Sequence, residues 1–176
     1  IITGQNQADW FEDYATWRTS KGVSTGIYTT NFIYANYDGA DNAEKLRNFL
    51  VDAYASWSDA PELFEYVILG GDDEIIPERG VYGRVWNTVD RRMPADMYFG
   101  NLDGDWNANG NNIYGEENDD VDMLAELHVG RFTAETETQF DNIMRKTMHY
   151  VDNNTFSNNI ATFFGENLNN NQIGRA

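Results

Sequence analysis

Apolar residues recur along this chain at helical spacing in three stretches. The clearest stretch follows Asp41, where one face of a helix would carry Leu46, Phe49, Leu50, Ala53, Tyr54 and Trp57. Asp41 and Glu44 have the spacing of a capping box, so we expect this helix to begin at Asp41. The same spacing predicts a helix over Ala8–Ser20, and another that Thr133 caps and that ends before Asn153.

Short apolar runs between turn residues predict the strands. Tyr66–Leu69 is apolar throughout, as in a central parallel strand that is covered on both faces. The other expected strands are Val23–Thr30, Val81–Trp86, Met97–Gly100, Leu127–Phe132 and Ile160–Phe164, with a basic turn at Arg91–Pro94. Because strands alternate with helices, the sequence predicts an α/β fold, a three-layer sandwich with a mainly parallel sheet. We expect a single domain over residues 1–176.

Acidic residues dominate the composition. The 176 residues include 29 Asp and Glu against 12 Lys and Arg, and this net charge of −17 would repel phosphate backbones and anionic lipid. We therefore expect neither nucleic acid nor a membrane surface as a partner. No apolar run approaches the roughly 20 residues that span a bilayer. Aromatic residues make up 14% of the chain, which argues against disorder.

Cysteine is absent from the chain, which limits its chemistry. The chain can supply neither a disulfide, nor a zinc-thiolate site, nor a thiol nucleophile. The sequence opens on Ile1 rather than methionine, so we expect an excised or processed piece of a longer protein.

The stretch from Asp103 to Glu116 has the pattern of a looped calcium site. Counted from Asp105, it has oxygen-bearing side chains at positions one, three and five, a glycine at six and a glutamate at twelve. Calcium takes about six to eight oxygen ligands, and a tight loop turns alternate side chains inward. The expected calcium ligands are Asp103, Asp105, Asn107, Asn109, Asn111 and Glu116.

The surroundings of this loop differ from those of a helix-loop-helix calcium hand. The apolar residue of such a loop usually stands at position eight, whereas Ile113 stands at nine, and a strand-like run precedes the loop. We therefore expect a calcium loop between strands. The alternative is a solvated turn, because Asn, Asp and Gly all favour turns. The acidic residues that follow, Glu117, Asp119, Asp120 and Asp122, fit a solvated surface better than further ligands.

A second acidic group follows the Tyr66–Leu69 run. Two glycines precede Asp72, Asp73 and Glu74, without the glycine spacing of a nucleotide-binding turn. Open α/β sheets place their sites beyond the carboxyl ends of the strands, so these carboxylates fit an active-site rim or a second ion site. A polar turn that caps the strand is the simpler interpretation.

Several segments, taken in order, carry a family resemblance. Residues 17–22 (WRTSKG) form a W-basic-x-x-basic-G segment, and residues 66–77 (YVILGGDDEIIP) form an apolar strand, a Gly-Asp turn and an Ile-Pro exit. Residues 128–132 (HVGRF) form a V-G-R strand that a helix follows. In order and spacing, this pattern resembles the amino-terminal half of the catalytic domain of the gingipain-type cysteine peptidases, peptidase family C25.

The resemblance implies a caspase-like fold and peptide-bond cleavage by a cysteine thiolate, a proton-carrying histidine and a supporting acid. Glu166, just after Ile160–Phe164, stands at the family's acidic position. The cysteine and the histidine would come from the remaining carboxyl-terminal half of the domain. His128 and His149 do not match the catalytic histidine, so we expect both to be structural. The family also binds calcium, as the Asp103–Glu116 pattern would.

Three functions remain open. The first is the amino-terminal portion of a secreted or cell-surface, calcium-binding cysteine endopeptidase, which acts on proteins or peptides and is inactive as this chain alone. The second is a non-catalytic, calcium-dependent binding or adhesion module. The third is an aspartyl hydrolase that pairs two of Asp72, Asp73 and Asp105.

Overall fold

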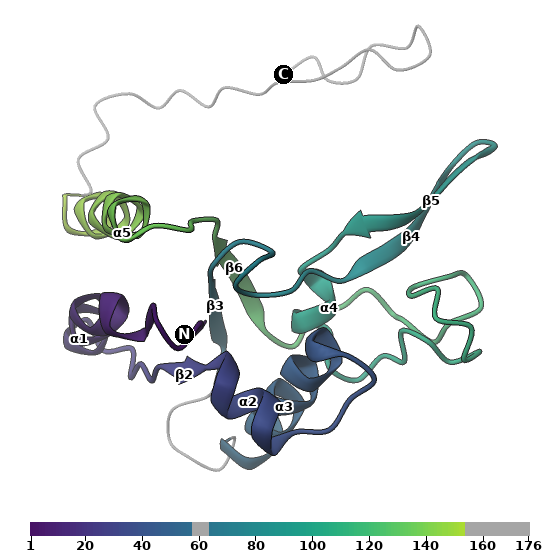
Figure 1. Cartoon of the computed structure of the whole chain (residues 1–176), viewed down its shortest axis with the longest axis horizontal. Coiled ribbons are helices and arrows are strands. Elements are labelled where there is room, and N and C mark those ends of the chain that lie inside the picture. Colours follow the sequence, from purple (N-terminus) through teal and green to yellow (C-terminus); the bar gives the residue numbers. More distant parts are fainter. Residues whose placement is uncertain (58–63, 154–176) are drawn as a thin grey trace, which may run out of the picture.

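A parallel sheet forms the centre of the computed structural model, which describes residues 1–57 and 64–153 (Figure 1). The sheet has four strands in the order β2-β1-β3-β6, and all neighbours run parallel. The strands are β1 (Ile2–Thr3), β2 (Tyr28–Thr29), β3 (Tyr66–Gly70) and β6 (His128–Phe132). The sequence prediction of a mainly parallel α/β sheet is therefore confirmed.

Helices cover both faces of this sheet (Figure 1). One face carries the short 3-10 helix η1 (Ala8–Phe11), α1 (Glu12–Ser20) and α5 (Glu137–Asp152). The other face carries α2 (Thr30–Asn36) and α3 (Asn42–Trp57). The arrangement is the predicted three-layer sandwich.

Strand β3 divides the core into two apolar clusters. Val67 and Leu69 are buried against the α2 and α3 side, whereas Ile68 packs with the aromatic cluster beneath α1 and α5. In that second cluster, the rings of Phe11 and Phe140 meet edge to face with centroids 5.1 Å apart. Burial on both faces explains why β3 is apolar throughout.

A hairpin and a long loop extend the sandwich between β3 and β6. Strands β4 (Gly80–Val85) and β5 (Thr88–Pro94) pair antiparallel and project from the body (Figure 1). One helical turn, α4 (Met97–Gly100), follows the hairpin. The loop from residue 101 to 127 then leads to β6 and includes the predicted calcium loop.

Three predicted elements were wrong in type or extent. Met97–Gly100 is helical, because the N–H groups of Phe99 and Asn101 bond back to the carbonyls of Asp96 and Met97. Arg91–Pro94 belongs to β5 and is not a turn. Of the predicted strand Val23–Thr30, only Tyr28–Thr29 pairs in the sheet, and it ends there because the Thr29 hydroxyl caps α2 by accepting the Phe32 N–H.

The long helices follow the sequence more closely. Helix α3 has the predicted cap, since the Asp41 carboxylate accepts the Glu44 N–H at 2.9 Å. Helix α5 begins three residues later than expected, because Thr136, and not Thr133, forms a capping box with Gln139. The predicted strand Ile160–Phe164 lies outside the described residues. Within the described residues, no helix is both long and apolar enough to cross a membrane.

Candidate functional site

The carboxyl ends of β3 and β6 lie side by side, where open α/β sheets place their sites. Gly70, the last residue of β3, pairs with Phe132, the last residue of β6. Gly71 then turns the chain sharply, and a Cβ at this position would lie 2.5 Å from the Ile75 side chain. The glycine is required here because only hydrogen fits between this backbone and Ile75.

Arg131 of β6 holds this edge together. Its guanidinium donates two hydrogen bonds to the Asp96 carboxylate, at 2.7 and 2.8 Å. Its Nη1 also donates to the carbonyl oxygens of Gly71, Asp72 and Ile76, at 2.8 to 3.3 Å. The arginine of the V-G-R strand therefore fixes the turn after β3 against the residues before α4.

Acidic side chains line the rim of this edge. A cleft of about 250 Å³ lies among Asp72, Asp73, Glu78, Pro94, Asp96, Arg131 and Thr133. Next to the cleft, a hydrogen bond with Asp72 and the charges of Asp72, Glu74 and Asp73 raise the pKa of the Glu135 carboxyl. Carboxylates therefore gather at this edge, and Glu135, which precedes the Thr136 cap of α5, lies beside them.

Asp105 does not join this rim. Its backbone pairs with Asp120, and its carboxylate accepts the Asn107 N–H at 3.0 Å. Among the described residues, it makes no hydrogen bond with Asp72 or Asp73. The structure therefore does not pair Asp105 with either of the other two carboxylates that the aspartyl-hydrolase hypothesis names.

A partly buried arginine and a buried asparagine hold the loop that follows α4. Arg47 of α3 donates to the carbonyl oxygens of Tyr98, Asn101 and Gly104, at 2.7 to 3.2 Å. Asn101 is fully buried, and its amide donates to the Asp122 carboxylate and to the Leu124 carbonyl. The Asn101 amide oxygen also accepts the Trp106 indole N–H at 3.0 Å.

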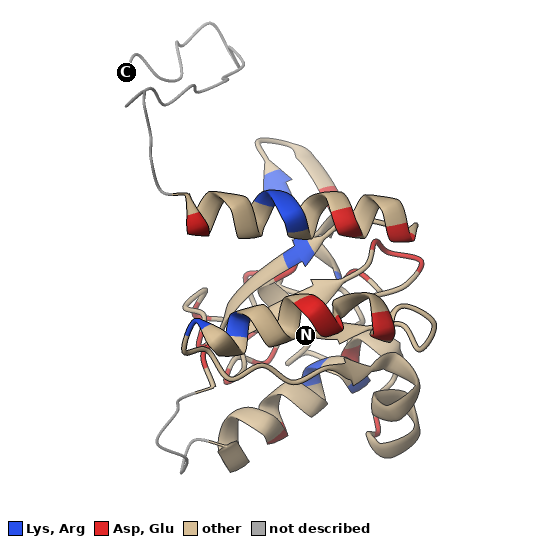
Figure 2. Ribbon diagram, turned by 90° about the vertical axis from the view of Figure 1, so that its left-hand side faces the viewer, with Lys and Arg blue, Asp and Glu red and all other residues tan. Residues whose placement is uncertain are grey.

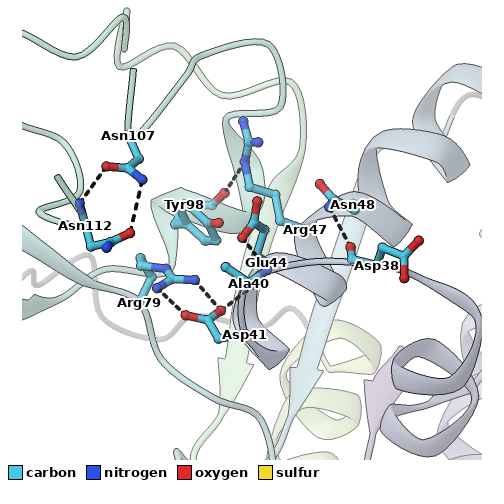
Figure 3. A network of polar contacts seen from close by, with 10 residues as sticks. All are labelled: Asp38, Ala40, Asp41, Glu44, Arg47, Asn48, Arg79, Tyr98, Asn107 and Asn112. Carbon is cyan, nitrogen blue, oxygen red and sulfur yellow. Dashed lines mark hydrogen bonds and ion pairs between the residues drawn. The ribbon is translucent and has the colours of Figure 1, made fainter. Parts of the chain in front are cut away.

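Arg79 connects this loop to the start of α3 (Figure 3). Its side chain is only 7% exposed and donates to both oxygens of the Asp41 carboxylate, at 2.6 and 2.8 Å. Its guanidinium carbon lies 3.9 Å from the ring centroid of Tyr114 and 4.6 Å from that of Tyr98. The two aromatic faces stabilise the cation where water does not reach it.

Within the predicted calcium loop, the expected ligand oxygens bond to the loop's own backbone. The side-chain oxygens of Asp105, Asn109 and Asn111 each accept the N–H two residues ahead, at 2.7 to 3.0 Å. The Asn107 oxygen accepts the Asn112 N–H at 2.9 Å (Figure 3 shows this pair). Gly110, at position six, has the left-handed φ of 70° that the sharp turn requires.

Glu116 closes the loop from its far end. Its carboxylate accepts the side-chain N–H groups of Asn109 at 3.1 Å and Asn111 at 2.5 Å. The hydrogen bonds from Asn111 and Asn109, followed by the charge of Arg91, lower the pKa of Glu116. Asp119 accepts the Glu116 N–H at 2.9 Å and so also faces the loop.

The side chains of this loop carry carboxylate and amide oxygens, which are the ligands that calcium prefers. Positions five and twelve meet, but Asn109 presents its amide nitrogen, not its oxygen, to Glu116, and so does Asn111. Among the described residues, no three Asp, Glu, His or Cys side chains gather as a metal site. Calcium would therefore need amide oxygens, and the two asparagine amides would have to rotate.

The remaining residues that the sequence analysis considered lie at the border of the loop or away from it. Asp103 is exposed at a bend before the loop. Asp119, which the sequence pattern assigns to a solvated surface, contacts the loop more closely, and only its three-residue spacing from Glu116 could have indicated this. His128 stacks on Tyr66 at 5.4 Å, and His149 lies in the last turn of α5. Glu166 lies outside the described residues.

Comparison with known proteins places this architecture in a family. The sequence profile of peptidase family C25 matches residues 1–175. The chain belongs to peptidase family C25. This match confirms the predicted family resemblance. Among curated proteins, none matches the chain.

Solved structures show the same fold at low sequence identity. The chain is similar to a structure described as a protease, with 19% identity and a TM-score of 0.60, over 85% of this chain and 27% of that one. It is also similar to the Arg specific cysteine proteinase gingipain R (RgpB), with 19% identity and a TM-score of 0.57, over 85% of this chain and 27% of that one.

A third similar structure is a complex of the pro- and mature domains of RgpB from Porphyromonas gingivalis. The identity is 19% and the TM-score 0.57, over 85% of this chain and 28% of that one. The chain therefore spans only about a quarter of the length of the structures that it matches. These likenesses establish the gingipain-like, caspase-like fold of this C25 chain.

Proposed function

We propose that this chain is the amino-terminal portion of a calcium-binding, gingipain-like cysteine endopeptidase. The observation that carries the proposal is the match of the C25 profile to residues 1–175. The chain supplies the scaffold of the peptidase domain and Glu166 as the acid that supports the catalytic histidine. Its substrates are proteins or peptides, and the enzyme is secreted or lies at the cell surface.

The arrangement of the carboxyl edge supports this role. Arg131 fixes the turn after β3 through three backbone carbonyls and the Asp96 carboxylate, so the edge is rigid before any substrate binds. Rigid strand ends are suited to orient side chains for catalysis. The same edge is where a doubly covered parallel sheet exposes its strand ends.

The nucleophile and the proton carrier come from sequence beyond this chain. The chain has no cysteine, and a carboxylate alone cannot form an acyl-enzyme. We infer that continuation of the sequence provides a Gly-His-Gly-like segment and then a cysteine at a strand end. In that complete site, Glu166 would accept the N–H of the histidine ring and hold the imidazole in the orientation that removes the thiol proton.

Calcium has a structural role in this proposal. Asp105, Asn107, Asn109 and Glu116 would hold the ion, with Asp119 nearby to offset its charge. A bound ion would fix the loop between α4 and β6, which Arg47 and Asn101 already attach to the sandwich. No step of peptide cleavage requires the ion.

Expression of the chain together with the sequence that follows it tests the peptidase assignment. The extended protein should cleave peptides under reducing conditions and lose this activity after treatment with iodoacetamide, which alkylates the nucleophilic thiol. The 176-residue chain, which has no thiol, is the matched control and should not cleave. Absence of cleavage by the extended protein, or cleavage that resists alkylation, would support the non-catalytic binding module instead.

A further inference from the structure

The hairpin formed by residues 80–94 exposes an apolar tip and a basic surface. All seven residues of β5 are exposed, as are the tip residues Val85 (64%) and Trp86 (76%). Trp86 also has a left-handed φ of 56°, which bulky side chains rarely adopt. Two-stranded hairpins are marginally stable without further packing, so an exposed hairpin of this kind is suited to contact a partner.

Strand register brings the arginines of the hairpin together. Arg84 pairs directly with Val89, so both side chains point to one face, and Tyr82 lies on that face two residues earlier. The register shift between Val81 and Gly83 places Arg91 and Arg92 opposite Tyr82. The hairpin holds three arginines and one aspartate in a chain of net charge −17, and Figure 2 shows these blue segments on its strands.

The loop before β6 exposes the complementary surface. We call residues 117–124 the acidic segment: it contains Glu117, Asp119, Asp120 and Asp122, followed by Met123 and Leu124. Met123 is 52% exposed and Leu124 is 68% exposed. The segment therefore offers carboxylates beside exposed apolar side chains, whereas the hairpin offers arginines beside exposed apolar side chains.

We propose that the hairpin of one copy of this chain binds the acidic segment of a second copy. The charges are opposite and both surfaces expose apolar side chains, so each side has what the other would bury. The hairpin and the loop that contains the acidic segment project from the same end of the molecule, away from α1 and α5 (Figure 1). A two-fold axis would therefore form both contacts at once.

The pairing between copies uses Arg84 and Arg92 in particular. Among the described residues, Arg84 is hydrogen-bonded only through Nε, to the Trp86 carbonyl at 3.0 Å, so its terminal nitrogens can reach a partner, whereas the charge of Arg91 already acts on Glu116 of its own chain. Asp119 and Asp122 accept hydrogen bonds within their own loop. Glu117 and Asp120 are exposed and are the carboxylates available to the partner.

Sedimentation equilibrium in EDTA at physiological salt tests the pairing. At this ionic strength, salt screens the long-range repulsion between the acidic copies, so mainly charges in direct contact affect the association. The parent chain should form dimers reversibly as its concentration rises. Arg84→Glu with Arg92→Glu should weaken this association at least ~tenfold. The matched control, Arg145→Glu with Lys146→Glu on exposed α5 positions, makes the same charge change and should leave the association unchanged.

The reciprocal variant gives a sharper result. Glu117→Lys with Asp120→Lys lowers the net negative charge and so reduces the general repulsion between copies. If only this repulsion mattered, the variant would form tighter dimers, whereas the proposed contact predicts weaker ones. A mixture of the hairpin variant and the acidic-segment variant restores opposite charges at both contacts and should form a heterodimer. Circular dichroism of each variant checks that its fold is retained.

Several outcomes would overturn the proposal. A chain that is monomeric at every concentration would contradict it, and so would a dimer that both variants leave intact. Failure of the mixture to associate, when each variant alone has lost association, would also contradict the reciprocal contact. Binding of the monomer to anionic lipid vesicles that is lost in Trp86→Asn would assign the hairpin to a membrane surface instead. None of these outcomes depends on the peptidase assignment.

Discussion

Arg79 and Asp41 form a two-fold hydrogen-bonded ion pair that attaches the base of the β4–β5 hairpin to the start of α3. Burial would raise the pKa of the Asp41 carboxyl, but the hydrogen bonds from Arg79 and from the Glu44 N–H, with the Arg79 charge, outweigh it and hold that pKa below its ordinary value. The same guanidinium lies over Tyr114 of the candidate calcium loop. One arginine thus joins helix, hairpin and loop.

Asp41→Asn removes the charge while it keeps a side chain that can cap α3. At neutral pH we expect a loss of about 2 kcal/mol in the free energy of unfolding, less than for a fully buried pair because Asp41 is half exposed. The lowered pKa means that the ionised carboxylate stabilises the fold above its ordinary value of 3.8, and that this stability is lost as pH falls through the folded value.

The difference between parent and Asp41→Asn in urea unfolding should therefore shrink as the pH falls below about 4. Asp38→Asn, at an exposed position nearby, is the control and should change the stability little at any pH. A difference that stays constant from neutral to acidic pH would show that Asp41 acts through its shape alone.

Arg131→Lys tests the clamp at the carboxyl edge. Lysine has no fork to pair with Asp96 while it also reaches three carbonyls, so we expect a loss of about 3 kcal/mol in the free energy of unfolding. Hydrogen exchange of the Ile76 N–H, which bonds to the Asp72 carbonyl at 2.8 Å, should become faster.

Arg145→Lys serves as the matched control for that clamp. Arg145 is 71% exposed and pairs with Asp141 on the surface of α5, so its replacement should cost less than about 0.5 kcal/mol. Equal effects of the two substitutions would mean that Arg131 does not fix the turn.

The sequence predicts best those elements whose pattern is local. Helix α3 has its cap and its apolar face within one stretch, and β3 is recognisable because both of its faces are buried. The short strand β1, Ile2–Thr3, lies between β2 and β3 and has no pattern of its own. Only pairing with distant strands makes Ile2 and Thr3 extended, and single-sequence patterns do not contain that information.

The candidate sites divide in the same way. The Gly110 turn and the contact of Asn109 with Glu116 follow from spacing, whereas calcium binding by the loop stays a prediction. Arg79 and Asn101 could not be predicted, because their partners lie far along the chain and are mostly backbone atoms or rings. The same holds for Glu135, which reaches Asp72 only because α5 packs beside the strand ends.

Calcium should stabilise this chain if the loop binds it. An amide-rich site is expected to have a dissociation constant of about 10⁻⁴ to 10⁻³ M, so ~10 mM calcium should add about 1.4 kcal/mol or more. For a domain of this size, that corresponds to a rise of roughly 3–6 °C in Tm relative to EDTA. Scanning calorimetry measures the rise, and magnesium at the same concentration serves as the ion control.

Asp105→Asn with Glu116→Gln should abolish the calcium effect on Tm while it retains the hydrogen bonds of the loop. Asp38→Asn with Glu12→Gln removes the same charge at exposed positions and should retain the effect. If calcium leaves the Tm of the parent chain unchanged, the calcium assignment is contradicted and residues 103–116 are a polar turn. Membership of family C25 would be unaffected.

The measurement closest to the central claim is peptide hydrolysis by the extended protein with Glu166→Gln. If Glu166 orients the catalytic histidine, kcat should fall roughly 10²- to 10⁴-fold while KM changes little. Glu12→Gln, a neutral replacement at an exposed carboxylate, should leave kcat unchanged. A Glu166→Gln enzyme with the parent's kcat would contradict the assignment of this chain as the part of the peptidase that supplies the supporting acid.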